Sequence, residues 1–518
     1  MGLDHFRAPQ RSAAIAGLYP AGTCQRRPHT PRRTGWHRQL RVAARRWAPG
    51  LPALITLAVM LWQIRVPSFW RDEAATLSAT QRSFPDLLRL LGNQDAVHGT
   101  YYALMWVVVR LGGSGELTAR LPSALAMAVA ASMVTALGRR LVSLRAGLAA
   151  GLVFAVLPPV SWFGQDARPF AAETALACVA SYLFVRVLGA GKSRRRRWLG
   201  GYGLTLVTLG LANLFGLLLI AAHAVTLATA HRDRGRWLAR GWLVTVAAAG
   251  TVLLPFIWLS WSERRQIQWL EAAGVPPPVT LERLLGSIRL APVMLLIMGC
   301  AVIVSALGGR ARLRADWPLR LPALCLPWLL LPTAILLAVS QLEPVYTFRY
   351  VVFSIPATAL LVGAGLAAAG RATACAGLVL IVLLGLPAQL PERGPVGHGD
   401  GLRQLDQILS VQERPGDVLV YPGDGGLRTF AAAYPFGLAT LPDVALGRTP
   451  ARSASIGGIN APIARTQARL AGAARVWVPE MLGSRPSAPV PALRGLPFQL
   501  VSTWALGDNI WLALYARY

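Results

Sequence analysis

The sequence is poor in charged side chains, and lysine is almost absent from it. Only 14% of the 518 residues are Asp, Glu, Lys or Arg, 54% are hydrophobic, and Lys192 is the single lysine. A soluble protein of this length would carry charges on about a quarter of its residues. The shortage of charge therefore excludes an ordinary soluble enzyme.

Cysteine is also scarce, with five residues in the whole chain. Four of them lie inside apolar stretches and one lies near the N-terminus, at Cys24. None has the spacing of a metal-ligand set or of a disulfide framework. The pattern indicates packing residues and says little about the redox compartment.

Acidic residues are outnumbered, which gives the chain a net charge of +29. Clusters of arginine lie in the short gaps between apolar stretches, where positive charge sets the orientation of a membrane protein. This arrangement argues against a nucleic-acid partner. Residues 1–46 contain ten arginines and little apolar periodicity, which predicts a disordered cytoplasmic tail that contacts anionic lipid.

Apolar stretches of about 17 to 25 residues match a hydrocarbon layer about 30 Å thick. The sequence therefore predicts an α-helical polytopic protein of the cell (plasma) membrane with about eleven transmembrane helices. Placing the Arg-rich gaps inside puts the N-terminus in the cytoplasm and the C-terminus outside. The predicted spans are 49–65, 121–137, 146–162, 167–190, 198–212, 213–230, 241–260, 291–308, 321–341, 351–370 and 372–390.

Residues 66–120 form one large outer loop of the transmembrane module, which is predicted over 47–396. The apolar stretch 101–111 within this loop is too short to span, so we expect a helix in the outer interface. Residues 397–518 predict a small extracytoplasmic α/β domain, because turn signals alternate with short apolar runs. Its expected strands are 418–421, 474–478, 499–504 and 510–515, and its expected helices are 402–411 and 427–433.

This topology gathers acids, arginines and aromatic residues at the outer face. Asp72 and Glu73 follow the first span, and acids at such a position lose hydration at a cost. Asp166 and Glu173 are seven residues apart, so we expect them on one face of a helix. Non-catalytic interpretations stay open: His98 could be an interfacial side chain, and the arginines could extend to lipid headgroups.

Five short motifs then occur in order, followed later by Arg349-Tyr350. Over about residues 50–390 this series resembles the GT-C membrane glycosyltransferases, and it is most similar to glycosyltransferase family 39. That family comprises the polyprenyl-phosphate-mannose protein mannosyltransferases and their bacterial relatives. The motifs are Trp70-Arg71-Asp72-Glu73, His98-Gly99-Thr100-Tyr101-Tyr102, Ala119-Arg120-Leu121-Pro122-Ser123-Ala124, Gly138-Arg139-Arg140-Leu141 and Gln165-Asp166-Ala167-Arg168-Pro169-Phe170.

The resemblance implies an enzyme that moves a sugar from a polyprenyl-phosphate donor to an acceptor hydroxyl on the outer face, with inversion. Asp72 matches the general base of such a reaction, and Glu73 would orient the acceptor or Asp72. Arg168 and Arg349 suit the lipid phosphate, because a guanidinium fork matches phosphate oxygens, and Tyr350 would add a hydrogen bond. The substrate-binding residues expected from the motifs and their surroundings are His98, Tyr102, Gln165, Asp166 and Glu173.

Several points stay open at the level of sequence. The family implies mannose, but arabinose or another pentose fits as well, and the acceptor could be a protein, a lipid or a glycan. No metal site is predicted, although a divalent cation near Asp72, His98 and Asp166 would fit the chemistry. Two other functions compete: a transporter or flippase of polyprenyl-linked glycans, which would also need outer arginines and intramembrane acids, and a non-enzymatic scaffold of the cell envelope.

Overall fold

A computed structural model describes most of the chain after the first 47 residues, and the predicted N-terminal tail lies outside its described residues. Parts of the Arg-rich gaps and of the segment after Glu263 also lie outside them. The described ranges are 48–230, 236–263, 277–307, 319–423, 426–482, 485–508 and 510–518.

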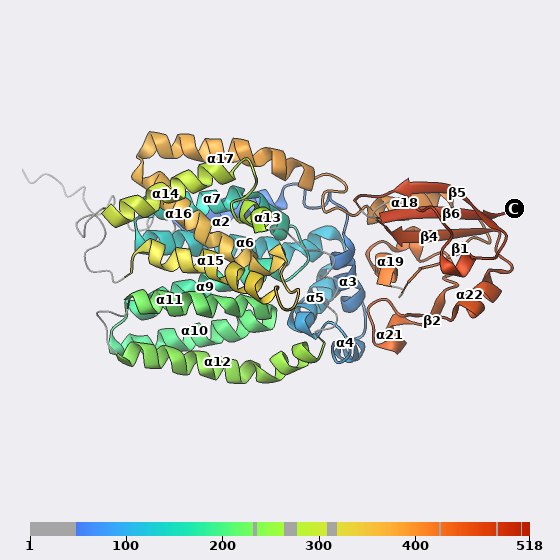
Figure 1. Cartoon of the computed structure of the whole chain (residues 1–518), viewed down its shortest axis with the longest axis horizontal. Coiled ribbons are helices and arrows are strands. Elements are labelled where there is room, and N and C mark those ends of the chain that lie inside the picture. The colour runs from blue at the N-terminus through green and yellow to red at the C-terminus, as the bar shows by residue number, and fades with distance from the viewer. Residues whose placement is uncertain are drawn as a thin grey trace, which may run out of the picture. The chain divides into compact units, whose positions relative to one another are not determined.

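Long apolar helices make up the larger part of the described structure (Figure 1). Within the described ranges, six helices are long and apolar enough to cross a membrane, and a bent pair adds a seventh. Each of the eleven predicted spans coincides with a helix or helix pair. The count of eleven stays a prediction, because four of these helices are shorter or less apolar than a membrane-spanning helix requires. The six are α6 (Glu116–Leu141), α9 (Phe170–Leu188), α12 (Arg236–Ser262, apolar from Leu238), α15 (Leu321–Val339), η5 with α16 (Phe348–Ala368) and α17 (Arg371–Glu392).

The remaining apolar helices are shorter or interrupted. One predicted span, 146–162, is not a single helix: α7 (Leu144–Val156) and α8 (Pro158–Gly164) meet at an angle of 64°. The bend lies at Leu157, whose backbone is extended with ψ of 130°, because a proline disfavours the helical conformation in the residue before it. The others are α2 (Gly50–Leu61), α10 (Lys192–Ala212), η2 (Leu214–Leu218), α11 (Leu219–Ala230), α13 (Pro277–Leu284) and α14 (Ala291–Leu307).

Small residues allow helix α7 to pack closely against two of its neighbours. A Cβ atom added at Gly147 would lie 2.4 Å from the Thr135 carbonyl oxygen of α6, and one added at Gly363 of α16 would lie 2.3 Å from the Ala150 nitrogen. In a membrane, helices gain stability chiefly from such close packing, because lipid tails supply no hydrophobic drive between them. The glycines therefore hold the centre of the helical bundle together.

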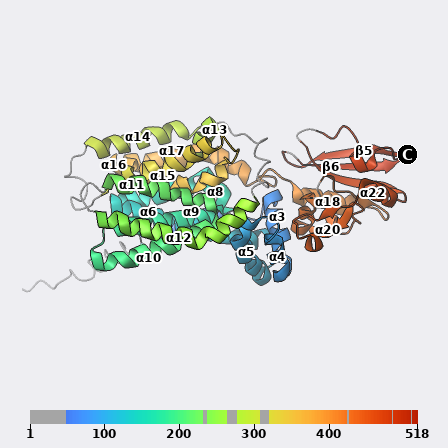
Figure 2. The same cartoon turned by 60° about the horizontal axis from the view of Figure 1, so that its bottom comes forward.

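Three short helices occupy the predicted outer loop: α3 (Arg71–Thr80), α4 (Phe84–Leu91) and α5 (Gly99–Gly112). Helix α5 confirms the helix expected over 101–111, while its position at a membrane interface stays a prediction. In both views these helices lie beside the C-terminal region (Figures 1 and 2). They share one hydrophobic core with it, in which Phe69 and Leu77 join Leu405 and Trp477.

The C-terminal region contains a four-stranded sheet in the order β1-β4-β6-β5. Strand β1 runs parallel to β4, and the other two pairs are antiparallel. The sheet confirms the four predicted strands, and α18 (Leu402–Gln412) and α19 (Thr429–Ala433) confirm the two predicted helices. The strands of the sheet are β1 (Val418–Leu419), β4 (Arg475–Met481), β5 (Phe498–Ala505) and β6 (Ile510–Arg517).

Candidate active site

Helix α3 begins directly after Trp70 and carries both predicted carboxylates in its first turn. Acids are favoured there, because the free backbone N–H groups give the start of a helix a partial positive charge. The backbone N–H of Trp70 donates to Oε2 of Glu73 at 3.3 Å, which closes this turn. Local sequence thus explains the position of both acids but does not separate their roles.

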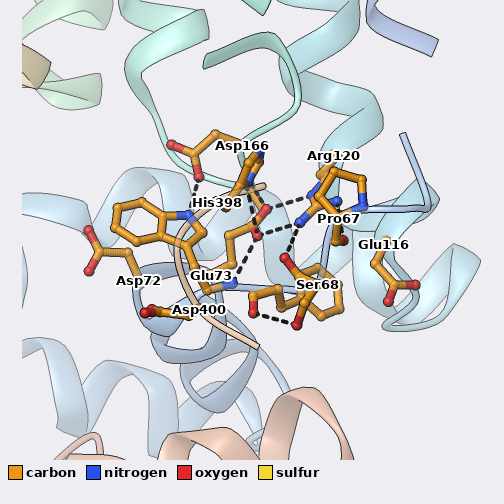
Figure 3. A network of polar contacts seen from close by, with 12 residues as sticks. Pro67, Ser68, Asp72, Glu73, Glu116, Arg120, Asp166, His398 and Asp400 are labelled. Atoms are coloured by element: carbon orange, nitrogen blue, oxygen red, sulfur yellow. Dashed lines mark hydrogen bonds and ion pairs between the residues drawn. The ribbon is translucent and has the colours of Figure 1, made fainter. Parts of the chain in front are cut away.

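The two neighbouring carboxylates point into different surroundings (Figure 3). The side chain of Asp72 is 22% exposed and lines the larger of two cavities near the end of the helical bundle. The side chain of Glu73 has no exposed surface and lines neither of these cavities. Only Asp72 is therefore placed to meet a ligand.

Glu73 is the centre of a buried hydrogen-bond cluster. Its Oε1 accepts from Nε of Arg120 at 2.8 Å and from the backbone N–H of Ala167 at 2.9 Å, and its Oε2 accepts from Nη2 of Arg120 at 2.7 Å. Burial raises the pKa of Glu73, but the charge and hydrogen bonds of Arg120 outweigh burial and hold it below its ordinary range. The cluster connects α3 to α6 and to the turn before α9.

Asp72 faces two guanidinium groups. Arg349 forms an ion pair with the Asp72 carboxylate, and Nη1 of Arg168 lies 3.4 Å from the Asp72 carbonyl oxygen. Burial raises the pKa of Asp72, but the charges of Arg349, Arg168 and Arg71 outweigh it, so the pKa is below its ordinary value. The carboxylate is therefore ionised at neutral pH.

Arg168 also organises the polar wall of the cavity. Its Nη2 lies 2.6 Å from Nε2 of His98, and its Nη1 lies 3.3 Å from the hydroxyl of Tyr102. Because a guanidinium only donates, Nε2 of His98 accepts and the imidazole proton sits on Nδ1. Burial, together with the charge of Arg168, lowers the pKa of His98 well below its ordinary value, which keeps the ring neutral.

Tyr102 extends this wall to a further acid. Its hydroxyl donates to Oδ2 of Asp95 at 2.7 Å, and Asp95 adopts a left-handed backbone conformation with φ of 64°. Burial raises the pKa of Asp95. The Asp95 side chain lines the cavity beside His98, so the wall presents carboxylates, guanidiniums and one neutral imidazole together.

The larger cavity has a volume of about 560 Å³ and combines this polar wall with an apolar one. Most of the apolar side chains come from η2, α12 and α15, and the ring of Tyr350 lies stacked on Phe215 with 4.3 Å between the ring centroids. A ligand with a charged head and a hydrocarbon tail fits such a division. The apolar lining residues of these three elements are Leu214, Phe215, Leu218, Ile257, Trp261, Ile335, Leu336 and Val339, and Ala75, Val97, Phe170 and Val345 add to them.

A second cavity of about 370 Å³ shares Phe170 and Arg349 with the first. Trp70 and Trp162 form part of its lining, and the guanidinium of Arg349 lies 5.7 Å from the centroid of the Trp70 ring. The indole N–H of Trp70 donates to Oδ1 of Asp166 at 3.0 Å, which holds the ring in place. Trp70 and Arg349 thus stand where the two cavities adjoin.

The structure brings together only part of the predicted set. Asp72, His98, Arg168, Arg349 and Tyr350 line the larger cavity, and Tyr102 supports them by contacting Arg168. Among the described residues, no group of three His, Cys, Asp or Glu side chains is close enough together to hold a metal ion.

The other predicted substrate-binding residues lie away from this cavity. Gln165 donates to the carbonyl oxygens of Met60 and Trp62, at 2.6 and 2.8 Å. The shared helical face expected for Asp166 and Glu173 is wrong, because α8 ends at Gly164 and α9 begins only at Phe170. Glu173 instead accepts from Nδ2 of Asn213 at 2.9 Å inside the bundle.

Some site residues received no role from the sequence. Arg120 stands in one of the recognised motifs, and its position near the start of a predicted span was the available signal. His398 and Asp400 lie between glycines in the segment after the last span, and no family motif marks them. Both reach α3: Nδ1 of His398 lies 3.8 Å from Oε2 of Glu73, and Oδ2 of Asp400 accepts from the backbone N–H of Arg71.

Comparison with known proteins agrees with the resemblance that the motifs indicate. The family model described as dolichyl-phosphate-mannose-protein mannosyltransferase matches residues 100–261, a segment that contains Arg120 and Arg168 but neither Asp72 nor Arg349. No curated protein matches the chain at a significant level.

Solved structures show the fold. ArnT from Cupriavidus metallidurans, in the apo state and bound to undecaprenyl phosphate, aligns with 90% of this chain and 97% of its own, at 14% identity and a TM-score of 0.56. The oligosaccharyltransferase AglB from Archaeoglobus fulgidus, in complex with an inhibitory peptide and a dolichol-phosphate, aligns with 85% of this chain and 70% of its own, at 10% identity and a TM-score of 0.51. The resemblance to the GT-C membrane glycosyltransferases is thus confirmed in sequence and in fold.

Proposed function

We propose that the protein transfers a sugar from a polyprenyl-phosphate donor to an acceptor hydroxyl at the outer face of the membrane. The observation that carries the proposal is the larger cavity, in which Asp72 and two guanidiniums face one long apolar wall. The bound undecaprenyl phosphate of ArnT and the dolichol-phosphate of AglB support a lipid of this class. Mannose is the sugar that the family match favours.

The donor lipid would lie with its hydrocarbon along α12 and α15 and its phosphate beside Arg168 and Arg349. Guanidinium groups bind phosphate oxygens through two parallel hydrogen bonds, which orients the leaving group as well as holding it. Tyr350 lines the same cavity and would donate a further hydrogen bond from its hydroxyl. These three residues would stabilise the charge that develops on the departing lipid phosphate.

Asp72 would accept the proton of the attacking hydroxyl. In the free protein Arg349 pairs with this carboxylate and contributes to its lowered pKa. A phosphate that competes for the Arg349 guanidinium would weaken this pairing, and the pKa of Asp72 would rise toward that of an effective base. Donor binding would thus activate the base, and attack on the face opposite the phosphate would invert the anomeric carbon.

His98 would act as a neutral hydrogen-bond donor to the sugar or the phosphate. Its Nε2 is occupied by Arg168, and its Nδ1 has no hydrogen-bond partner among the described residues.

We infer a different role for the buried predicted residues Glu73, Gln165, Asp166 and Glu173. Their hydrogen bonds run to protein groups, so they would position the site and not touch the substrate.

The direct experiment uses the full chain reconstituted in lipid vesicles with polyprenyl-phosphate mannose and polyprenyl-phosphate arabinose, each labelled in the sugar and in the lipid. We expect one donor to yield free polyprenyl phosphate together with a glycosylated product. A transporter, the competing function, would move the labelled donor across the vesicle membrane without cleaving the bond between the sugar and the lipid phosphate. Movement without cleavage for both donors would contradict the proposal, and an Asp72→Asn sample supplies the inactive control.

A further inference from the structure

The segment that leaves the last apolar helix does not run freely to the C-terminal domain. We call residues Arg393–Arg403 the strap. At its start, Nη1 of Arg393 donates to the Trp62 carbonyl oxygen at 2.8 Å and Nη2 donates to Oγ of Ser161 at 2.5 Å. At its end, the backbone N–H of Arg403 donates to Oγ of Ser68 at 3.0 Å. The strap therefore crosses the end of the bundle in direct contact with the segment that leads into α3.

Asp400 lies within the strap, between Gly399 and Gly401, and is buried, with 3% of its surface exposed. Its Oδ2 accepts the backbone N–H of Arg71, the first residue of α3, at 2.9 Å (Figure 3 shows Asp400 beside this turn). The Trp70 side chain does not cap this helix. A carboxylate at this position satisfies an N–H group that would otherwise lack a helical partner, and it interacts favourably with the helix dipole. The strap thus supplies an acceptor for the Arg71 N–H, in addition to the bond from the Trp70 N–H to Glu73 within the helix.

The C-terminal domain holds Asp400 through the turn between β5 and β6. The backbone N–H of Gly401 donates to the Leu506 carbonyl oxygen at 2.9 Å, and that of Asp508 donates to the Gly399 carbonyl oxygen at 2.8 Å. Gly507 has a φ of 97°, and a Cβ atom added there would lie 2.0 Å from the Gly399 oxygen. Only glycine fits this approach, because other residues have neither the conformation nor the space.

We propose that Asp400 is a positioning residue through which the C-terminal domain holds Asp72 in place for catalysis. The proposal rests on the proposed role of Asp72, which is the residue directly after Arg71. Loss of the bond between Arg71 and Asp400 would loosen the first turn of α3 and displace the Asp72 carboxylate from Arg349 and from the acceptor. A displacement of about 1 Å at a reacting group can lower a rate on the order of 10²-fold. The C-terminal domain is in this account a part of the active site, although it lines neither cavity.

The test compares Asp400→Ala with Asp400→Asn in the full chain. The asparagine keeps an oxygen that accepts from Arg71, whereas the alanine does not. We expect Asp400→Ala to lower kcat about 10- to 100-fold with the KM for the lipid donor unchanged, and Asp400→Asn to stay within about threefold of the parent. Hydrogen exchange of the amides of residues 71–75 should be about tenfold faster in Asp400→Ala only.

Asp406 provides a matched control. It is a second buried aspartate of the same domain, and its Oδ1 accepts the backbone N–H groups of Gly437 and Leu438 at 2.7 and 3.0 Å. Asp406→Ala should lower the thermal stability of the domain but leave both kcat per folded molecule and exchange in α3 unchanged. Equal behaviour of Asp400→Ala and Asp406→Ala in α3 exchange and kcat would overturn the proposal. Failure of the parent protein to cleave any donor would instead refute the proposed function, and the exchange data would still decide the role of Asp400.

Discussion

Asp72 and Glu73 are adjacent acids in one turn of one helix, yet their surroundings differ in almost every respect. Asp72 is partly exposed, lines a cavity and pairs with Arg349. Glu73 is fully buried and pairs with Arg120, which is itself fully buried. The comparison teaches that a carboxylate pair after an apolar helix is not a catalytic pair by default, because one member can stabilise the framework that positions the other.

Removal of Arg120 should have the largest effect, which is on protein stability. It tests the buried member of the comparison, the Glu73–Arg120 pair. Arg120→Met leaves the Glu73 carboxylate buried without its partner and should destabilise the protein by about 3–5 kcal/mol. Thermal unfolding in detergent measures the loss. The double variant Glu73→Gln/Arg120→Met should recover part of it, because no uncompensated charge remains. A stable Arg120→Met protein would contradict the framework role of the cluster.

Removal of Arg349 tests the other member of the comparison, Asp72, which lines the larger cavity. Arg349→Ala should raise the KM for the lipid donor about tenfold or more, since a charge-assisted contact to phosphate is lost. It should also shift the acid limb of the pH–rate profile to higher pH, because Arg349 lowers the pKa of Asp72 and a base with a higher pKa becomes protonated at higher pH. Arg283→Ala, at the second cavity, is the control that leaves the acid limb in place. An unmoved limb in Arg349→Ala would show that Asp72 is not the titrating group.

A smaller effect is expected at the wall between the cavities. Trp70→Phe keeps an aromatic ring but removes the indole N–H that Asp166 accepts at 3.0 Å. A hydrogen bond of this kind contributes about 0.5–1.5 kcal/mol, which corresponds to about a 2- to 10-fold loss of turnover if the ring shifts. Steady-state kinetics with the lipid donor measures it. Turnover above that of the parent would contradict a positioning role for this bond.

The smallest effect should come from the predicted residues that lie away from the cavity. Glu173→Gln keeps an oxygen that accepts from Asn213 and removes an acidic group that the proposed reaction does not use. We expect turnover and the KM for the donor to stay within about twofold of the parent. A loss approaching that of Arg349→Ala would return Glu173 to the substrate-binding set.

Much of the fold could be predicted from the sequence, because it depends on local patterns. The apolar stretches coincide with helices, and the four C-terminal strands follow from alternation between turns. The bend before Pro158 and the helix break that separates Asp166 from Glu173 were missed, because an apolar window records composition and not the extended conformation that a proline favours in the residue before it.

The site was only partly predictable, because its decisive contacts are long-range. The sequence offers no means of separating Asp72 from Glu73, since the partners of Glu73 lie 47 and 94 residues away in the chain. Asp400 is still more distant, because it lies 329 residues from Arg71, whose backbone N–H donates to it. The arginines of the cavity were predicted because the family motifs mark them, whereas Asp400 stands outside any motif.

The most direct test of the account measures two properties of Asp72→Asn in one preparation: sugar transfer and equilibrium binding of polyprenyl phosphate. Removal of the base should lower transfer about 10²- to 10⁴-fold. Binding should be equal to or tighter than that of the parent, because Arg349 no longer pairs with a competing carboxylate. Transfer at near parental rates would contradict the catalytic role of Asp72, and loss of lipid binding would contradict the placement of the phosphate beside Arg349.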